Sequence, residues 1–432
     1  MKSLRTFKEI YSFYKQISGN NSGIINSPIY QPVINDQMKF YVMSAIFPNY
    51  ENLLNCEKRM SYHLAGYGIT RQEALIRLVG EAIERYSLVY CHEYLKNKIF
   101  RSTYANLIKS RYNVMNLRFL NVFNETKEIN HVLTDDVIGW FKLINVLNRE
   151  CIFIPAQMFF LTYAPTNRTK EKINFSSVST GTASHTSYEN ALKNSLIEYL
   201  QTDSFMLFWY GKNVHAPEVM LDDETKSFLE KNKLFPSNHD VLVLDLTFDK
   251  PFPIFVIIIH GEEYPRFSFG IQGSHSPYQA LYRGLLESAS VMNYLDGSFF
   301  HNTDEFIRTY DKKQVFDNLD SNSIFWANEF QISDKNNFLK SKIRGKKNIS
   351  DIRIVNEKNL MTRILDYIKI NHFNLGCYDI TCPEIGLRGG WYVIRTIIPE
   401  LLPMCVPNSC FYNHPRFLKV GGCKYILPHP LP

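Results

Sequence analysis

Three stretches of this chain begin a helix with the same arrangement of residues. Each starts at a hydroxyl residue and reaches Ala-Leu four and five residues later, and the starts are Thr70, Ser187 and Ser276. After the first and third starts, Glu73 and Gln279 follow three residues on, which is the capping-box spacing that satisfies free amide donors at a helix N-terminus. The sequence therefore predicts three helices that begin at these positions.

Each predicted helix also carries polar residues at the same distances from its start, seven, eleven and fourteen residues on, among mostly apolar neighbours. Spacings of four and three place side chains on one face of a helix. Each helix is therefore expected to be largely buried with one polar stripe. The stripes are, in chain order, Arg77, Glu81 and Glu84; Asn194, Glu198 and Gln201; and Arg283, Glu287 and Ser290.

Two interpretations of the stripes are open. They face water, as on most amphipathic helices, and the repeat is a coincidence. Alternatively they converge, and carboxylates gathered without lysines then need cations between them. Magnesium takes carboxylate and phosphate oxygens together, and Arg77, Arg85 and Arg283 would contact phosphate. The second interpretation predicts a nucleotide site built on helices, in a chain that has no GxxxxGK[ST] or GxGxxG motif.

These segments resemble the YcaO family. Glu81-Ala-Ile-Glu84-Arg85 is similar to the ExxER helix of that family, and Arg283-Gly-Leu-Leu-Glu287 is similar to its RxxxE motif. Residues 180–204 resemble its second nucleotide-binding segment. The resemblance covers roughly residues 60–432 and implies an α+β fold with mixed and antiparallel sheets, whose helices line a central ATP site.

The same resemblance implies ATP and Mg²⁺ as cofactors and assigns roles to the stripes. The implied magnesium ligands, direct or through water, are Glu81, Glu84, Glu198 and Glu287. The implied nucleotide-binding residues are these four together with Arg77, Arg85, Asn194, Gln201 and Arg283.

The chain end, Pro428-His429-Pro430-Leu431-Pro432, resembles the PxPxP terminus of YcaO proteins that form azoline rings. The resemblance points to the cyclodehydratase subunit of thiazole/oxazole-modified microcin or streptolysin-like biosynthesis. It implies that Pro428, His429, Pro430 and Pro432 reach the active site, where a stiff polyproline segment loses little entropy. The terminal carboxylate or His429 is a candidate proton acceptor. The alternative is a frayed proline-rich end.

The implied reaction is ATP-dependent cyclodehydration of Cys, Ser or Thr in a ribosomally made precursor peptide, in which the amide oxygen of a hemiorthoamide is phosphorylated to give a thiazoline or oxazoline. Alternatives are a thioamide- or amidine-forming enzyme and a catalytically silent scaffold subunit. The chain departs from the family where many relatives have lysine, since it reads Gly66-Tyr67-Gly68, and at Gln201 and Ser290.

The expected partners are the precursor peptide, a leader-binding subunit, a flavin-dependent dehydrogenase subunit and a second copy in a homodimer. No nucleic acid partner is expected, because 48 Lys and Arg against 42 Asp and Glu leave a net charge of only +6. The N-terminus has no signal-peptide pattern, so a cytoplasmic protein is expected. The most apolar run, Phe252–His260, is too short for a transmembrane segment and predicts a buried strand.

The expected organisation is an N-terminal lead-in (1–59), a nucleotide-binding core (60–300), a polar helical insertion (301–375) and a C-terminal part of the core (376–432). The basic run Lys340–Lys347 is interpreted as a solvated loop. Two C-x4-C pairs, Cys377/Cys382 and Cys405/Cys410, leave open a zinc site or buried thiols, with buried thiols favoured.

Overall fold

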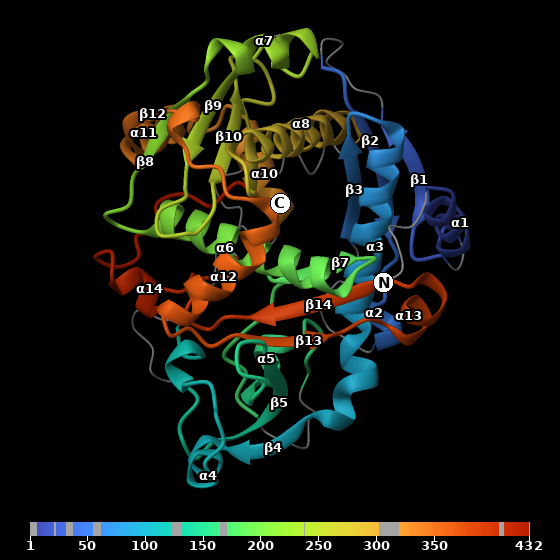
Figure 1. Ribbon diagram of the computed structural model, residues 1–432, viewed down its shortest axis with the longest axis vertical. Helices are drawn as coiled ribbons and strands as arrows, with labels where there is room; N and C mark the ends of the chain where they lie inside the picture. Colours follow the sequence, from blue (N-terminus) through green and yellow to red (C-terminus); the bar gives the residue numbers. More distant parts are fainter. Residues whose placement is uncertain are drawn as a thin grey trace.

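The computed structural model describes residues 7–20, 23–31, 38–54, 62–122, 131–164, 171–236, 238–301, 319–405 and 410–431. Three sheets and the helices between them form the molecule (Figure 1). This arrangement confirms the predicted α+β class with mixed and antiparallel sheets. None of the described helices combines the length and apolar character that crossing a bilayer requires.

The first sheet is antiparallel and has the order β1-β2-β3. Its strands are β1 (Asn26–Gln31), β2 (Tyr41–Phe47) and β3 (Tyr62–Gly68). The second sheet has the order β11-β10-β9-β8-β12, in which only the β12–β8 pair is parallel. Its strands are β8 (Ala216–Met220), β9 (Asp240–Asp245), β10 (Ile254–His260), β11 (Phe267–Gly273) and β12 (Ile343–Asn348).

The third sheet has the order β4-β5-β13-β14-β7, with β6 paired to β5. Its strands are β4 (Phe100–Thr103), β5 (Val137–Asn145), β6 (Cys151–Pro155), β7 (Thr182–His185), β13 (Gly376–Asp379) and β14 (Tyr392–Ile397).

The three predicted helices are present as α3 (Arg71–Leu95), α6 (Tyr188–Tyr210) and α8 (Pro277–His301). The remaining helices are α1 (Phe7–Ile17), α2 (Glu51–Leu54), α4 (Tyr104–Lys109), α5 (Ala156–Phe159), α7 (Asp223–Lys231), α10 (Leu319–Ala327), α11 (Ile332–Lys342), α12 (Glu357–Ile370), α13 (Pro383–Gly389) and α14 (Pro415–Leu418). Thr70 caps α3 as predicted, because its side chain accepts from the Glu73 amide. The Ser187 side chain makes no such bond.

The most apolar run is the buried strand β10, as the sequence predicts. Its side chains alternate between two cores. Ile254, Val256 and Ile258 belong to the larger core, and Phe255, Ile257 and Ile259 to the core beneath α8. Because both faces are covered, the strand reads as a continuous apolar run rather than an alternating one. Figure 1 shows α6 running through the middle of the molecule, between the five-stranded and six-stranded sheets.

One sequence-based interpretation is corrected by the fold. The run Lys340–Lys347 is not a loop, since it forms the end of α11 and most of β12. Lys342 is buried there, and its Nζ donates to the Gly211 carbonyl at the end of α6, 2.9 Å away. The aliphatic part of the Lys342 side chain packs in the core, and its ammonium group has a hydrogen-bond partner. This explains how a basic residue of a charged run can be buried.

The predicted segment boundaries run through shared structure. β1 and β2 lie in the 1–59 lead-in but pair in one sheet with β3. The 301–375 segment supplies β12 to the five-stranded sheet, and its Trp326 is fully buried against Trp209 of α6. Both segments therefore contribute to the body of the protein.

Candidate functional site

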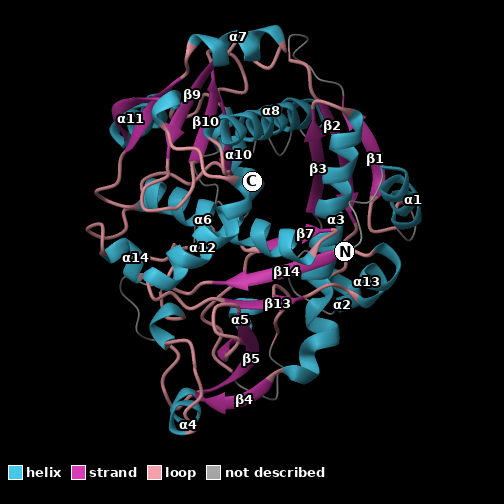
Figure 2. Ribbon diagram, in the orientation of Figure 1, coloured by secondary structure: helices cyan, strands magenta, loops and turns pink. Residues whose placement is uncertain are grey.

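Each of the three sheets ends at a strand that lies beside the predicted helices: β3, β7 and β11 stand at the ends of their strand orders. A terminal strand has a row of backbone amides without a neighbouring strand. α3 packs on β3 and β7, α6 on β7 and β11, and α8 on β11 and β3. The acids of the three polar stripes accept hydrogen bonds from these amides, as the following contacts show. Figure 2 shows helix α3 alongside strand β3.

On β3, the Ala65 amide donates to Glu81 Oε2 at 2.8 Å. α3 comes close enough for this because Gly66 has no side chain. A Cβ at Gly66 would lie 2.0 Å from the Ala74 carbonyl oxygen of α3, a distance that no real contact allows. The glycine before Tyr67 thus sets how near the first acidic stripe lies to the strand.

On β7, two alternate amides bind acids from two helices. The Ser184 amide donates to Glu84 of α3, and the Thr182 amide donates to Glu198 of α6. The Ser184 hydroxyl donates to the Gly80 carbonyl of α3 at 2.6 Å, which fixes the helix on the strand. Because amides two residues apart point to the same strand edge, Glu84 and Glu198 are brought to one place from different helices.

On β11, Glu287 Oε2 accepts from the Ile271 amide at 3.1 Å and from Gln272 Nε2 at 2.9 Å. Two residues on, the Gly273 amide donates to Gln201 Oε1 of α6 at 2.8 Å. α8 lies very close to β11, since a Cβ at Gly270 would lie 2.3 Å from the Gly284 carbonyl oxygen. Glu287 of the third stripe and Gln201 at the end of the second stripe are therefore held on the same strand.

The acids carry unusual pKa values because they are half-buried together. Burial raises the pKa of Glu81, although Arg85 opposes the rise. Burial, with Glu81 nearby, raises the pKa of Glu84 to about 7, and burial followed by the charge of Glu84 raises that of Glu198. Burial alone raises the pKa of Glu287 to about 7. Without a cation, the site holds more negative charge than the surroundings stabilise.

Arg85 is the nearest counter-charge. Its guanidinium lies 3.8 Å from Glu81 Oε1 and lowers the pKa of both Glu84 and Glu198. The second counter-charge, Arg395 of β14, was missed from the sequence. It is 1% exposed, donates to the Thr182 and Ser177 hydroxyls at 2.6 and 2.8 Å, and interacts with Glu84 and Glu198. The sequence feature that could have identified Arg395 is that it is the single charged residue within the apolar strand β14.

Tyr67 connects the Glu81 side of the site to the Glu287 side. Burial raises the pKa of Tyr67, and the charges of Glu287 and Glu81 add to the rise, so its hydroxyl stays protonated. The guanidinium of Arg77 lies 4.8 Å from the Tyr67 ring centre and is fixed by Glu73 Oε1 at 2.7 Å. Tyr67 therefore lies between the first and the third acidic stripes of the predicted site.

Arg283 and Asn194 complete the predicted set. Arg283 is half-buried on α8, and its pKa is lowered by burial and by the charge of Arg77. Asn194 is half-buried on α6, one turn before Glu198. The structure thus brings the predicted nucleotide-binding residues to the sides of one region bounded by α3, α6 and α8 (Figure 1).

The donor set fits magnesium with a triphosphate rather than a closed protein metal site. Among the described residues, no group of three or more His, Cys, Asp and Glu is arranged to hold a metal by itself. Glu84 and Glu198 form a pair, and Glu81 and Glu287 are held apart on β3 and β11. Magnesium is commonly bound by one or two carboxylates with water and phosphate oxygens, which this arrangement provides.

The C-terminal tail is packed rather than frayed over its described residues. Pro428, His429, Pro430 and Leu431 are buried. The Trp326 indole donates to the Pro428 carbonyl and the Ser323 hydroxyl to the Pro430 carbonyl, both at 2.8 Å. Both donors lie on α10, which contacts β11 and α8, and Figure 1 places the chain end near α10. Pro432 lies outside the described residues.

His429 does not lie with the carboxylates. It is fully buried beside Tyr210 and Phe205 in the C-terminal half of α6, and its Nε2 lies 2.6 Å from the Cys405 carbonyl oxygen. Burial lowers the pKa of His429 to about 4. The structure therefore gives this residue a packing environment and no hydrogen bond to the acids within the described chain.

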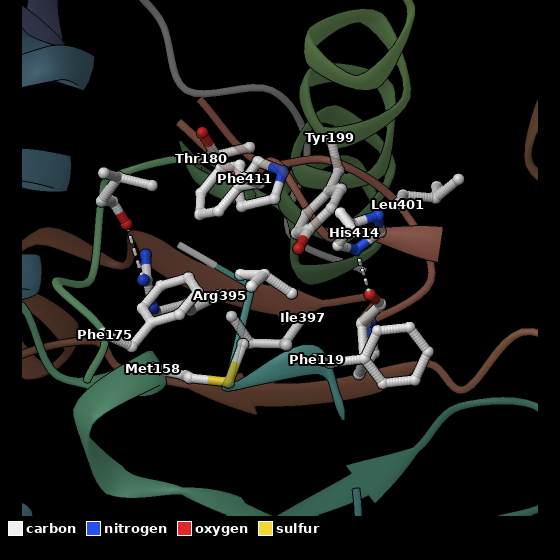
Figure 3. A pocket seen from close by; sticks show the side chains of 14 residues that line it. Phe119, Met158, Phe175, Thr180, Tyr199, Arg395, Ile397, Leu401, Phe411 and His414 are labelled. Carbon is white, nitrogen blue, oxygen red and sulfur yellow. Dashed lines mark hydrogen bonds between the residues drawn. The ribbon is translucent and has the colours of Figure 1, made fainter. Parts of the chain in front are cut away.

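A separate small cavity lies beneath β14 and α6 (Figure 3). It is lined mainly by apolar side chains, with Arg395, Tyr199 and His414 among them. None of the predicted site residues lines it. His414 Nε2 is hydrogen-bonded to the Pro399 carbonyl at 3.0 Å. The cavity is a gap in the core beside Arg395.

The two C-x4-C pairs do not form one four-thiol group among the described residues. Cys377 is on β13 and Cys382 precedes α13. Cys410 lies beside Cys423, with 3.4 Å between the sulfur atoms, and also interacts with Cys405. These cysteines are buried, in line with the favoured interpretation.

Known proteins resemble this chain in sequence and in fold. A family profile described as YcaO cyclodehydratase, ATP- and Mg²⁺-binding, matches residues 65–402. No curated protein sequence matches the chain. Among solved structures, the fold is similar to a heterocyclase in complex with substrate and cofactor, with a TM-score of 0.72 and 17% identity over 99% of this chain and 57% of the heterocyclase chain.

Two further structures share the fold. The YcaO protein from Methanopyrus kandleri bound with AMPPCP and Mg²⁺ has a TM-score of 0.61 and 14% identity over 92% of this chain and 91% of its own. The E. coli microcin synthetase McbBCD complex contains a chain with a TM-score of 0.57 and 14% identity over 89% of this chain and 90% of its own. This chain spans little more than half the length of the heterocyclase.

The coupling of Glu84 and Glu198 leads to a test by substitution. Glu198→Gln removes one like charge, so the ligand-free variant should melt at the same temperature as the wild type or higher. Its affinity for Mg²⁺ with AMPPCP should fall by about 100-fold, since mutation of even a residue that only supports the ligands of a metal site often lowers metal affinity by that much. Thermal shift and calorimetric titration measure both effects. Glu189→Gln, exposed on the first turn of α6, is the control, and equal affinity in the two variants would contradict the assignment.

The packing of His429 leads to a test by pH. Its pKa is about 4 in the folded chain and 6.5 as a free residue, so unfolding takes up a proton between these values. The contribution of His429 to the free energy of unfolding should therefore fall by about 3 kcal/mol as the pH falls from 6.5 to 4, whereas the raised pKa values of Glu84 and Glu287 act in the opposite direction. Burial also lowers the pKa of His414 to about 4. In urea titrations the wild type should therefore lose about 3 kcal/mol relative to His429→Gln between pH 6.5 and 4, and an unchanged difference between the two proteins would be inconsistent with the buried neutral ring.

Proposed function

Because this chain belongs to the YcaO family, we propose that it is the ATP-dependent cyclodehydratase of a peptide-modifying synthetase. The family match confirms the prediction made from the three helix motifs, and its description names ATP and Mg²⁺ as predicted. The proposed reaction converts Cys, Ser or Thr residues of a ribosomally made peptide to thiazoline or oxazoline rings.

The reaction needs a nucleophile held against a carbonyl and an activated oxygen to leave. The side-chain thiol or hydroxyl adds to the preceding amide carbon, and loss of the former carbonyl oxygen then closes the C=N bond of the ring. ATP, when bound, supplies the phosphoryl group that makes this oxygen a good leaving group. The residues of the chain provide positioning and charge neutralisation, which carry most of the catalysis in phosphoryl transfer.

The acids and arginines of the site have distinct proposed roles. Glu84 and Glu198 would share a magnesium ion, because their mutual repulsion is relieved by a cation between them. Glu81 and Glu287 would bind magnesium directly or through water from the two other strand edges. The proposed phosphate and nucleotide contacts are Arg77, Arg85, Asn194, Gln201 and Arg283.

One observation supports the proposal above the others: acids from α3 and α6 meet on alternate amides of β7, with pKa values raised by burial and by each other. Such an arrangement destabilises the ligand-free protein. A fold gains nothing from it unless a cation occupies the site. The same observation disfavours the scaffold alternative, in which the acids would have no ligand to hold.

The substrate and partners are proposed from the same family. The precursor peptide would be presented by a leader-binding subunit, and a flavin-dependent dehydrogenase would oxidise the rings. The fold shared with the E. coli microcin synthetase McbBCD complex supports an assembly of this kind. The PxPxP end favours ring formation over the thioamide- or amidine-forming alternative.

Glu287→Gln should abolish ring formation while the protein remains folded, because the amide is nearly isosteric and can still accept from the Ile271 amide. The readout is peptide mass spectrometry, in which each ring removes one water. Glu224→Gln, exposed on α7, should leave ring formation unchanged. Wild-type ring formation by Glu287→Gln would reject the proposed role.

The tail is proposed to bring its last residues to the site from α10. Deletion of Leu431 and Pro432 leaves the bonds of Trp326 and Ser323 to Pro428 and Pro430 in place. It removes one buried leucine, worth about 2 kcal/mol of stability. Ring formation should fall by about 100-fold, as expected for a misplaced catalytic segment, whereas nucleotide affinity should persist. A truncated chain that forms rings at the normal rate would remove the tail from the mechanism.

A further inference from the structure

The proposed function leaves one exposed histidine beside the site without a role. His63 lies on β3, two residues before Ala65, whose amide holds Glu81. Side chains at alternate positions of a strand share one face, so His63, Ala65 and Tyr67 face the same way. Tyr67 reaches both Glu81 and Glu287. The imidazole therefore lies about 7 Å along the strand from Ala65, at the next position on the face that borders the site.

The neighbour of His63 across this face belongs to α8. The ring centres of His63 and Tyr294 are 4.8 Å apart. Tyr294 stands seven residues after Glu287, which is two turns along the same helical face. The His63 ring is thus beside the polar stripe of α8, just beyond its metal-binding acid. Tyr294 also packs against the small core that contains Ile324 of α10, the residue after Ser323, which binds the tail.

The backbone at His63 faces the open edge of β3. Ala65 pairs with Ser44 of β2, yet its amide donates to Glu81. The Ala65–Ser44 pair is therefore a non-hydrogen-bonded one, and in an antiparallel sheet the pairs two residues away are of the same type. The amide and carbonyl of His63 consequently point away from β2. An extended peptide can hydrogen-bond to such an edge, with a side chain placed against the imidazole.

The His63 ring is suited to accept a proton. It is exposed to solvent, and no hydrogen bond occupies its nitrogens within the described part of the chain. Burial by the surrounding atoms nevertheless lowers the pKa of His63, so the ring is neutral at pH 7. Tyr294 is the titratable group that faces it from α8, and Ile46 is its partner on β2.

Three other histidines of the described chain are already engaged. His429 is enclosed and bonded to the Cys405 carbonyl. His414 is bonded through both ring nitrogens, to the Pro399 carbonyl and the Arg416 amide. His185 of β7 accepts from the Ser187 amide through Nδ1. Within the part of the chain that the structure describes, His63 combines ring nitrogens that make no hydrogen bond with access from solvent.

We propose that His63 is the base that takes the proton from the attacking side chain of the peptide, a catalytic role that rests on the proposed function. As the sulfur or oxygen of the peptide side chain forms its bond to the amide carbon, its proton moves to an imidazole nitrogen of His63. The electron pair of the broken C=O π bond moves to the carbonyl oxygen. The step produces an imidazolium and an alkoxide, and this oxygen is the one that the proposed function activates.

The test compares His63→Gln with the wild type. Both are assayed in the proposed assembly with two precursor peptides, one whose modifiable residue is Cys and one whose modifiable residue is Ser or Thr. Ring formation at Ser and Thr should fall by about 100-fold or more. The loss at Cys should be smaller, because a thiol with a pKa of about 8.5 is partly ionised at pH 7 without help. The melting temperature rise with Mg²⁺ and AMPPCP should equal that of the wild type. His215→Gln, exposed before β8, is the matched control.

A second variant separates catalysis from structure. Imidazole in solution should restore ring formation to His63→Gly, since it can enter the space left by the side chain. Failure of imidazole together with equal losses at Ser and Cys would overturn the proposal, as would ring formation by His63→Gln within threefold of the wild type. In these cases the wild type still forms rings and the proposed function stands. A wild-type assembly that binds nucleotide but forms no rings overturns both.

Discussion

The site depends on hydrogen bonds between strand amides and acids carried by helices. β3, β7 and β11 each end a sheet, and their free amides are taken by Glu81, by Glu84 and Glu198, and by Glu287 with Gln201. Terminal strands are a liability that a protein must cover. Here the covering groups are the acids that the proposed function requires for magnesium. The same hydrogen bonds therefore satisfy the amides at the edges of the sheets and position the acids.

This arrangement has an energetic consequence. Acids held at strand edges in half-buried positions keep raised pKa values, so the ligand-free protein carries an electrostatic cost at its centre. The cost is offset elsewhere by a large core. A buried ion network also fixes the position of α6. In that network Asp203 of α6 is paired with Lys250 and Arg416 at 2.7 and 2.9 Å. Removing one partner of such a network typically costs about 3–5 kcal/mol. The network connects α6 to α14, in the C-terminal part of the chain.

The helices and their stripes could be predicted from the sequence because caps and spacings of three and four residues are local signals. Which strands lie at the edges of the sheets could not be predicted, because strand order is set by contacts between residues far apart in the chain. Arg395 was missed since nothing local shows that its partners would be Thr182 and Ser177, more than 200 positions away. Lys342 was assigned to a loop because a basic run is usually solvated, and only the end of α6 explains its burial. His429 was grouped with the acids by its place in a motif, while its packing against α6 places it apart.

The central claim is that acids from three helices hold one magnesium–nucleotide complex between them. Anomalous diffraction from crystals grown with Mn²⁺ and AMPPCP tests it directly, because manganese occupies magnesium sites and its position is seen independently of the protein. The account predicts a manganese peak within coordination distance of both Glu84 and Glu198, with the triphosphate extending toward Glu287. A nucleotide bound outside α3, α6 and α8, with no peak between those two carboxylates, would contradict it.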